Sequence, residues 1–311
     1  MASRDLTAHL YDPSRGDPAI RTHALRSKGK PVEPARTNYF AIYHIASGSG
    51  TVWADSSTMA FEPSTLLFFV PYQQLRFVPD TPIHGEVIEF HANFLCVETF
   101  HAESGCSGIL FNDPYGLPVL ALPKAGQSEI VDLMGRLDRE QRETALAHGE
   151  IMLCYLKALL ILAARIKSSR IKSSATADGT LQPFDFRQPV IAQLRELIEK
   201  NYQSLHAPAD YAEQMHMSPK TLGRIVRDHL GTTLTDLIRN RILVHAKWQI
   251  LHTLKPVKEI ARELGFSDEL YFSRLFKKAT GHSPTFFREF ETRIRGGSNL
   301  SMFSGEPPIS K

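Results

Sequence analysis

Two segments near the C-terminus place basic and polar side chains at matching positions, about fifty residues apart. They are Tyr211–Leu237 and Ile260–Phe287, and they align with Arg224 opposite Arg274. Arginine and lysine on the outward face of a helix donate hydrogen bonds to guanine and to phosphate groups. In a helix-turn-helix, the second helix lies in the major groove of DNA. The repeat therefore predicts two DNA-reading helices on one chain.

Each segment also carries the signals that begin and end a helix. Ser218 can cap a helix that has Pro219 at its first position, and Ser267 or Asp268 can cap the second one. Gly265 permits the tight turn before that second cap. Glycines at the far ends are typical of helix termini. The predicted recognition helices are Lys220–Leu230, followed by Gly231, and Glu269–Thr280, followed by Gly281.

The candidate DNA contacts are the outward-facing residues in and just before these helices. In the first unit they are Ser218, Lys220, Thr221, Arg224 and Arg227. In the second unit they are Asp268, Glu269, Leu270, Ser273, Arg274 and Lys277. The structural alternative is that each arginine pairs with a nearby carboxylate and that Lys277 is only solvated. The aromatic residues Phe266, Tyr271 and Phe272 are expected in the core rather than stacked on bases.

The stretch between the two units predicts one continuous helix over Thr235–Thr253, with an apolar stripe along one side. Such a helix is roughly 30 Å long at about 1.5 Å per residue. One turn of DNA is about 34 Å. The spacing therefore predicts that one chain inserts its two recognition helices into successive major grooves.

These motifs resemble the C-terminal DNA-binding domain of the AraC/XylS family of bacterial transcription regulators. The resemblance rests on MSPKTLGR, RILVHAK and EIARELGFSDELYFSRLFKKATGHSPTFFR, and it covers residues 190–293. It implies sequence-specific binding to double-stranded DNA and activation through contact with RNA polymerase. The chain departs from the family pattern at Gly223, where many relatives have a larger residue, and at Val226, which replaces a phenylalanine. The first unit is therefore expected either to read fewer base edges than usual or to rely on contacts with the DNA backbone.

Charge is distributed unevenly along the 311 residues. Residues 211–296 hold 15 Lys and Arg against 9 Asp and Glu, whereas the remainder holds 21 against 24. A basic C-terminal third is typical of a nucleic-acid-binding module. Three scattered cysteines indicate a reducing compartment, and no secretory leader is expected, so we predict a cytoplasmic protein. The most apolar stretch, Ile151–Ala164, is too short to span a bilayer.

The N-terminal part has short β-type runs from Tyr39 onward, separated by turn residues. This pattern predicts an antiparallel barrel or sandwich. Ser47–Gly50 reads as a hairpin turn between two of the strands. The arrangement resembles the cupin-like sensor barrel that precedes many AraC-type domains, which implies a small-molecule effector. Residues 1–36 are unpatterned and are expected to form a loose arm.

A metal site in the barrel is not expected. Metal-binding cupins have a His-x-His pair, whereas this chain has His84, Glu86, Glu89 and His91. A second series, His91, Cys96, His101 and Cys106, recurs every five residues. That step alternates faces in a strand and rotates by about 140° in a helix, so neither structure gathers four zinc ligands. We therefore predict no cofactor and no enzyme. The alternative is a cupin-type metalloenzyme fused to a DNA-binding module.

Two helices are predicted after the barrel, over Gln127–Glu140 and Gly149–Lys167. The second has an apolar stripe wider than one packing face requires, which favours a homodimer contact. The alternative is simple packing on the barrel. The candidate dimer residues are Leu153, Leu156 and Leu160.

The sequence thus predicts an α+β protein with an antiparallel cupin-like barrel, a helical connector and an all-α double helix-turn-helix. A dimerising regulator without a ligand is the second alternative. The expected boundaries are 1–36 for the arm, 37–125 for the barrel, 126–167 for the connector, 168–188 for a flexible linker, 189–295 for the DNA-binding domain and 296–311 for a disordered tail.

Overall fold

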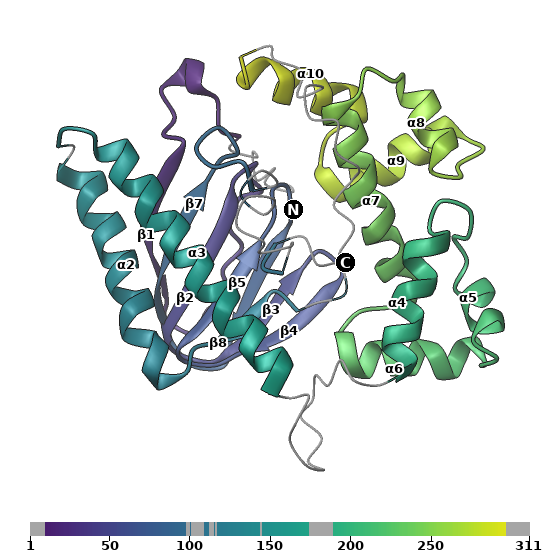
Figure 1. Cartoon of the computed structure of the whole chain (residues 1–311), viewed down its shortest axis with the longest axis horizontal. Coiled ribbons are helices and arrows are strands. Elements are labelled where there is room, and N and C mark those ends of the chain that lie inside the picture. Colours follow the sequence, from purple (N-terminus) through teal and green to yellow (C-terminus); the bar gives the residue numbers. More distant parts are fainter. Residues whose placement is uncertain are drawn as a thin grey trace. The chain divides into compact units, whose positions relative to one another are not determined.

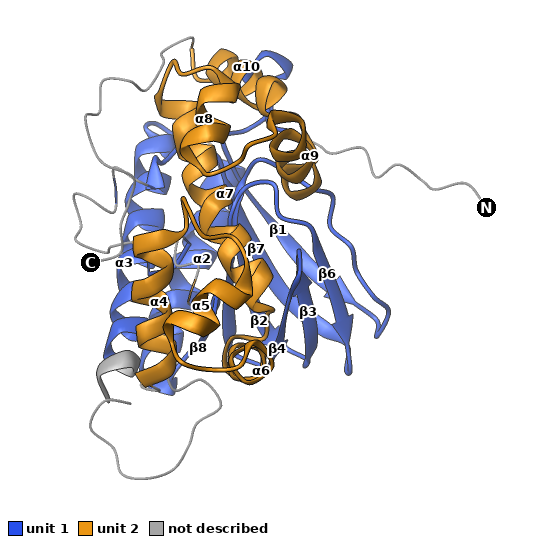
Figure 2. Ribbon diagram, turned by 90° about the vertical axis from the view of Figure 1, so that its right-hand side faces the viewer, with its two compact units in different colours: residues 1–113, 117–173 blue, residues 114–116, 174–311 orange. Residues whose placement is uncertain are grey.

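The computed structural model describes residues 10–97, 100, 109–111, 115, 117–143, 145–173 and 189–296. The chain divides into two compact units, shown in different colours in Figure 2. Unit 1 comprises residues 1–113 and 117–173, and unit 2 comprises residues 114–116 and 174–311. Within the described ranges, no helix is both long enough and apolar enough to cross a membrane. The α+β class predicted from the sequence is confirmed.

In the part of unit 1 that the structure describes, the strands form two antiparallel sheets rather than the closed barrel that we expected. The larger sheet has the order β1-β7-β2-β5-β8, and the smaller one has the order β4-β3-β6. A short 3-10 helix, η1 (Pro13–Arg15), precedes them. The strands are β1 (Ile20–Ser27), β2 (Phe40–Ser47), β3 (Gly50–Ala54), β4 (Ser57–Phe61), β5 (Thr65–Phe69), β6 (Leu75–Pro79), β7 (Ile83–Phe90) and β8 (Val119–Ala121).

Two corners explain why the strands separate into sheets. The predicted hairpin at Ser47–Gly50 is wrong, because β2 pairs with β5 and β7 whereas β3 pairs with β4 and β6. Gly48 has a φ of 95°, and a Cβ there would clash with the carbonyl oxygen of Pro82. The glycine lets the chain cross from one sheet to the other at close range. Tyr72, with a φ of 70°, lies at the corner between β5 and β6.

The prediction of a loose arm over residues 1–36 is wrong for β1. This strand pairs with β7 along its whole length, from Ile20 opposite Phe90 to Ser27 opposite Ile83. Polar residues conceal the strand pattern of β1 in the sequence. Two of them bind the carboxylate of Glu89: the Nε atom of Arg21 lies 2.6 Å and the Nε2 atom of His23 lies 3.2 Å from the Oε2 atom of Glu89. Burial alone would raise the pKa of Glu89, but these two partners outweigh it and lower the pKa.

Helices α2 (Lys124–Glu143) and α3 (His148–Ser173) cover the outer face of the five-stranded sheet (Figure 1). Both were predicted, but α3 extends through the first residues of the expected linker, and residues 174–188 lie outside the described part. Leu156 and Leu160 are fully buried against the sheet and α2. Their assignment to a dimer face is therefore wrong, since the sheet and α2 together occupy the wide stripe. Leu153 is half-buried.

Large apolar side chains fill the space between the two sheets of unit 1. Tyr43 and Phe69 from the larger sheet meet Phe77 from the smaller one, with ring centroids 5.0 and 6.5 Å from that of Phe77. Val52 and Phe61 complete the contact and are buried. The strands thus bury alternate residues on the sandwich side and the helix side, as period-two patterning requires.

The regular elements of unit 2 are all helices within its described residues. A partly buried ion pair joins its first helix to its central helix: Arg241 Nε lies 2.8 and 2.9 Å from the two carboxylate oxygens of Glu199. The helices are α4 (Pro189–Asn201), α5 (Pro208–Gln214), α6 (Pro219–Leu230), α7 (Leu234–His252), α8 (Val257–Glu263), α9 (Glu269–Thr280) and α10 (Pro284–Ile294). The predicted connecting helix is therefore α7, shifted by one residue at each end.

Candidate nucleic-acid interface

The first unit of the interface is the pair α5 and α6. The Ser218 hydroxyl accepts a hydrogen bond from the backbone N–H of Thr221 at 3.1 Å, and Pro219 is the first helical residue. At the other end Gly231 is left-handed, with a φ of 62°, and its N–H donates to the Arg227 carbonyl. The predicted start and end of this recognition helix are confirmed.

The second unit repeats this arrangement in α8 and α9. Of the two candidate caps, Asp268 forms the hydrogen bond, and its Oδ1 atom accepts from the backbone N–H of Leu270 at 2.7 Å. Gly281, with a φ of 84°, ends the helix by donating to the Lys277 carbonyl. α6 and α9 therefore have equal length, equivalent caps and equivalent ends.

The turns between the paired helices also correspond, but their residues differ. Gly265 has a φ of 82°, and a Cβ there would clash with the carbonyl oxygen of Gln203. In the first unit the equivalent residue is His216, with a φ of 53°. The first turn therefore keeps a side chain in a conformation that favours glycine.

All the predicted contact residues are at least partly open to solvent on α6, α9 or their caps. Arg274 has one ion pair, a 3.8 Å approach of its Nη2 atom to Asp268, and both side chains are more than half exposed. Exposed pairs of this length contribute little. Within the described residues, Arg224 forms no ion pair with any carboxylate. Both guanidinium groups are therefore available to bind a phosphate or a base.

The prediction about aromatic residues is correct for two of three. Phe266 and Phe272 are buried, with ring centroids 5.3 Å apart. Tyr271 is 46% exposed, so its placement in the core is wrong. It precedes the buried Phe272 by one position, which on a helix turns its side chain outward by about 100°. Leu270 beside it is 71% exposed.

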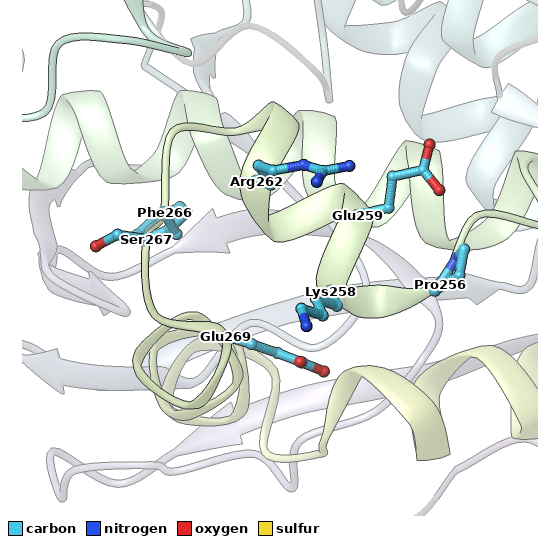
Figure 3. A pocket seen from close by; sticks show the side chains of 7 residues that line it. All are labelled: Pro256, Lys258, Glu259, Arg262, Phe266, Ser267 and Glu269. Carbon is cyan, nitrogen blue, oxygen red and sulfur yellow. The ribbon is translucent and has the colours of Figure 1, made fainter.

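A hollow between α8 and the start of α9 contains basic residues that the sequence analysis did not select. The side chain of Lys258 extends toward Glu269, while Arg262 leaves α8 on another side (Figure 3). Both cations are exposed. In a helix-turn-helix the first helix crosses the DNA backbone. Lys258 and Arg262 could therefore have been predicted from the sequence as basic residues in that helix. The other lining residues are Pro256, Glu259, Phe266 and Ser267.

The described residues of the chain contain no group of three or more His, Cys, Asp or Glu side chains that could hold a metal ion. His101 and Cys106, from the five-residue series, lie outside the described part. His91 is buried, with its ring 4.4 Å from that of Tyr11, and Glu89 is committed to Arg21 and His23.

Comparison with known proteins shows which proteins the C-terminal helices are similar to. A helix-turn-helix domain model matches residues 211–289. The arabinose operon regulatory protein of Salmonella typhimurium is 38% identical over 80 residues, which are 26% of this chain and 28% of that protein. The transcriptional activator RhaR of Escherichia coli K12 is 24% identical over 186 residues, covering 59% and 62% of the two chains. This chain therefore spans less than a third of the arabinose regulator.

Among solved structures, ToxT from Vibrio cholerae aligns over 90% of this chain and 99% of its own, at 13% identity and a TM-score of 0.36. The family match rests instead on the C-terminal helices, where the sequence model, the duplicated caps and the exposed basic residues coincide. The C-terminal region of this chain thus matches a helix-turn-helix domain model and is similar to the arabinose operon regulatory protein and to RhaR, which are AraC-type regulators.

Proposed function

We propose that the protein is a cytoplasmic transcription activator that reads two successive major grooves of its operator with α6 and α9. The observation that carries this proposal is the equivalence of the two recognition helices, which present Arg224 and Arg274 at the same place. Arginine bound to guanine is the commonest specific contact, and it contributes roughly 1–3 kcal/mol of discrimination. Helix α7, with 19 residues, is roughly 30 Å long at about 1.5 Å per residue, which is comparable to one DNA turn of about 34 Å.

Selection from randomised duplex DNA, followed by footprinting, tests this proposal. Arg224→Ala is expected to relax base preference in one half of the selected site, and Arg274→Ala in the other half, about one DNA turn away. Loss of preference at the same base pairs in both variants would contradict reading of two grooves. Absence of any sequence preference in the unmodified chain would contradict the whole proposal.

We further propose that the bound protein activates transcription through RNA polymerase. The support is the resemblance of the C-terminal domain to family activators, among which RhaR is described as an activator. Transcription in vitro from a promoter next to the selected site is expected to rise when the full chain is added. A fall in transcript from the same template would make the protein a repressor.

For unit 1 we propose that a small-molecule effector modulates DNA binding and that the protein is a homodimer. The partly exposed side of α3, which includes Ile151 and Leu153, supports the dimer. The effector rests on the resemblance of the N-terminal strands to a cupin-like sensor barrel, whereas the buried side chains between the sheets are the observation behind the alternative in which unit 1 dimerises without a ligand. Footprints measured with and without candidate metabolites separate the two, because only an effector changes the DNA affinity.

A further inference from the structure

The two recognition helices correspond residue by residue, so their side chains can be compared directly. α6 and α9 each begin after a side-chain cap and end at a left-handed glycine, and equivalent residues differ by fifty in number. Exposed basic residues occupy two equivalent positions: Arg224 and Arg274, then Arg227 and Lys277. Because the backbones correspond, a difference between exposed side chains at equivalent positions changes which chemical groups each helix can bind.

One such difference lies in the first turn. α6 has Lys220 and Thr221 there, whereas α9 has Leu270 and Tyr271. The side chain of Leu270 is 71% exposed, although its backbone N–H donates the capping hydrogen bond to Asp268. Tyr271 lies against Phe266, with ring centroids 6.0 Å apart, and still leaves nearly half of its surface in solvent. An exposed leucine and a half-exposed tyrosine therefore project from the start of the second recognition helix.

We propose that Leu270, flanked by Tyr271, binds the 5-methyl group of a thymine in the major groove. The N-terminal residues of a recognition helix are those that reach base edges. Thymine alone presents an apolar group on its major-groove edge. A leucine side chain has no hydrogen-bonding atom and can discriminate only through such a group. This inference rests on the proposed reading of DNA by α9.

The first unit has a different chemistry at the same place. Lys220 donates hydrogen bonds to guanine acceptors or to phosphate, and Thr221 is tied to the cap through a 2.8 Å contact between its hydroxyl and that of Ser218. The dependence on a thymine methyl group is therefore confined to the half of the operator that α9 occupies. The operator is chemically asymmetric even though the two helices share one backbone geometry.

Replacement of thymine by deoxyuridine tests the proposal, because it removes the methyl group and keeps the base pairing. The probe is the duplex selected from randomised DNA, and Arg274→Ala identifies the half that α9 reads. In that half, deoxyuridine is expected to weaken binding of the full chain by about four-fold for each contacted methyl group. In the other half, the same replacement is expected to leave the affinity unchanged.

Variants at Leu270 connect the effect to this side chain. Leu270→Ala is expected to bind thymine and deoxyuridine duplexes equally, while Leu270→Met, which stays apolar, retains the difference. Leu254→Ala is the matched control, since Leu254 is 79% exposed but lies between α7 and α8. This control is expected to keep the full thymine preference.

The inference is overturned by equal binding of both duplexes by the unmodified chain, by a selected half-site without thymine, or by an unchanged preference in Leu270→Ala. Each of these results leaves sequence-specific DNA binding intact. Failure of the selection itself would instead contradict the proposed function and the inference together.

Discussion

Gly265 and His216 occupy equivalent turns in the two helix-turn-helix units, and both have a positive φ. Only glycine adopts this conformation without a steric penalty, which for another residue is roughly 1–2 kcal/mol. In the second unit glycine is needed for two reasons: the positive φ, and the carbonyl of Gln203, which occupies the space where a Cβ would lie. The first unit has no glycine in its turn and is expected to be the less stable of the two.

The two turns predict opposite effects of substitution. Gly265→Ala is expected to destabilise the protein by more than about 2 kcal/mol, because backbone strain and a clash add together. His216→Gly is expected to change the free energy of unfolding by at most about 1 kcal/mol, in the stabilising direction. Urea unfolding measures both. An unchanged midpoint for Gly265→Ala would show that the turn adapts freely.

His245 gives unit 2 a dependence on pH. Burial, with Arg241 nearby, lowers the pKa of His245 from 6.5 to about 4, and Glu263 and Lys255 also act on it with opposite signs. Between pH 6.5 and 4 the unfolded chain binds a proton that the folded chain does not. The free energy of unfolding therefore falls as the pH decreases through this window, by up to about 3 kcal/mol.

The variant His245→Gln removes this group and keeps an acceptor for the Tyr202 hydroxyl, which lies 2.8 Å from Nδ1 of His245. Thermal unfolding at pH 7 and pH 5 is expected to differ less in the variant than in the unmodified protein. An equal loss of stability in both would assign the acid sensitivity to groups other than His245.

At the scale of the elements, the helices could be predicted from residues that are close in sequence. The sheets could not, because they depend on pairing between strands that are far apart in the chain. Ser218, Gly231 and Gly281 act on neighbours within one turn, so their roles could be read from the sequence. Ser47–Gly50 could not, because a hairpin and a corner between sheets require the same turn residues. β1 was missed for a related reason: Arg21 and His23 find their partner in Glu89, far along the chain.

Helix α3 illustrates the same limit on a single element. Its apolar stripe was correctly identified, but the sequence does not reveal that the sheet and α2 together cover Leu156 and Leu160. Width of a stripe alone cannot separate a two-sided core contact from contact with a partner chain. The exposure of the candidate DNA contacts was easier to predict, because an outward face is defined by the helix itself.

Two substitutions in α3 separate core from partner surface. Leu156→Lys is expected to unfold unit 1, because an unpaired ammonium group would be buried. Leu153→Lys is expected to leave the protein folded and to convert the proposed dimer into a monomer. Circular dichroism and sedimentation velocity distinguish these results. A monomer for the unmodified chain at micromolar concentration would contradict the dimer.

At the scale of the whole molecule, charge is concentrated in the DNA-binding domain: residues 211–296 hold 15 Lys and Arg against 9 Asp and Glu. Binding to DNA releases counterions, so the logarithm of the affinity is expected to fall steeply with the logarithm of the salt concentration. This electrostatic part is independent of sequence. It adds to the base contacts that we propose for the two recognition helices.

Lys277→Ala tests the electrostatic part. Loss of one phosphate contact is expected to reduce the salt slope by about 0.9 and to weaken binding to selected and random duplexes equally. Lys124→Ala is the control, since Lys124 is an exposed lysine at the start of α2 in unit 1. If Lys277→Ala loses only its preference for the selected site, the lysine contacts a base.

The unbroken course of α7 has a consequence for how the domain tolerates changes in length. Each residue inserted into a helix advances it by about 1.5 Å and rotates it by about 100°, whereas each base pair advances DNA by about 3.4 Å and rotates it by roughly 35°. One inserted residue would therefore aim α9 away from its groove. Seven residues restore the helix phase but add about 10.5 Å, close to three base pairs, and leave the groove about a quarter-turn out of phase. The rise and rotation of an α-helix do not match those of DNA at any short insertion. If α6 and α9 read successive grooves as proposed, the length of α7 is therefore expected to restrict the protein to one operator spacing.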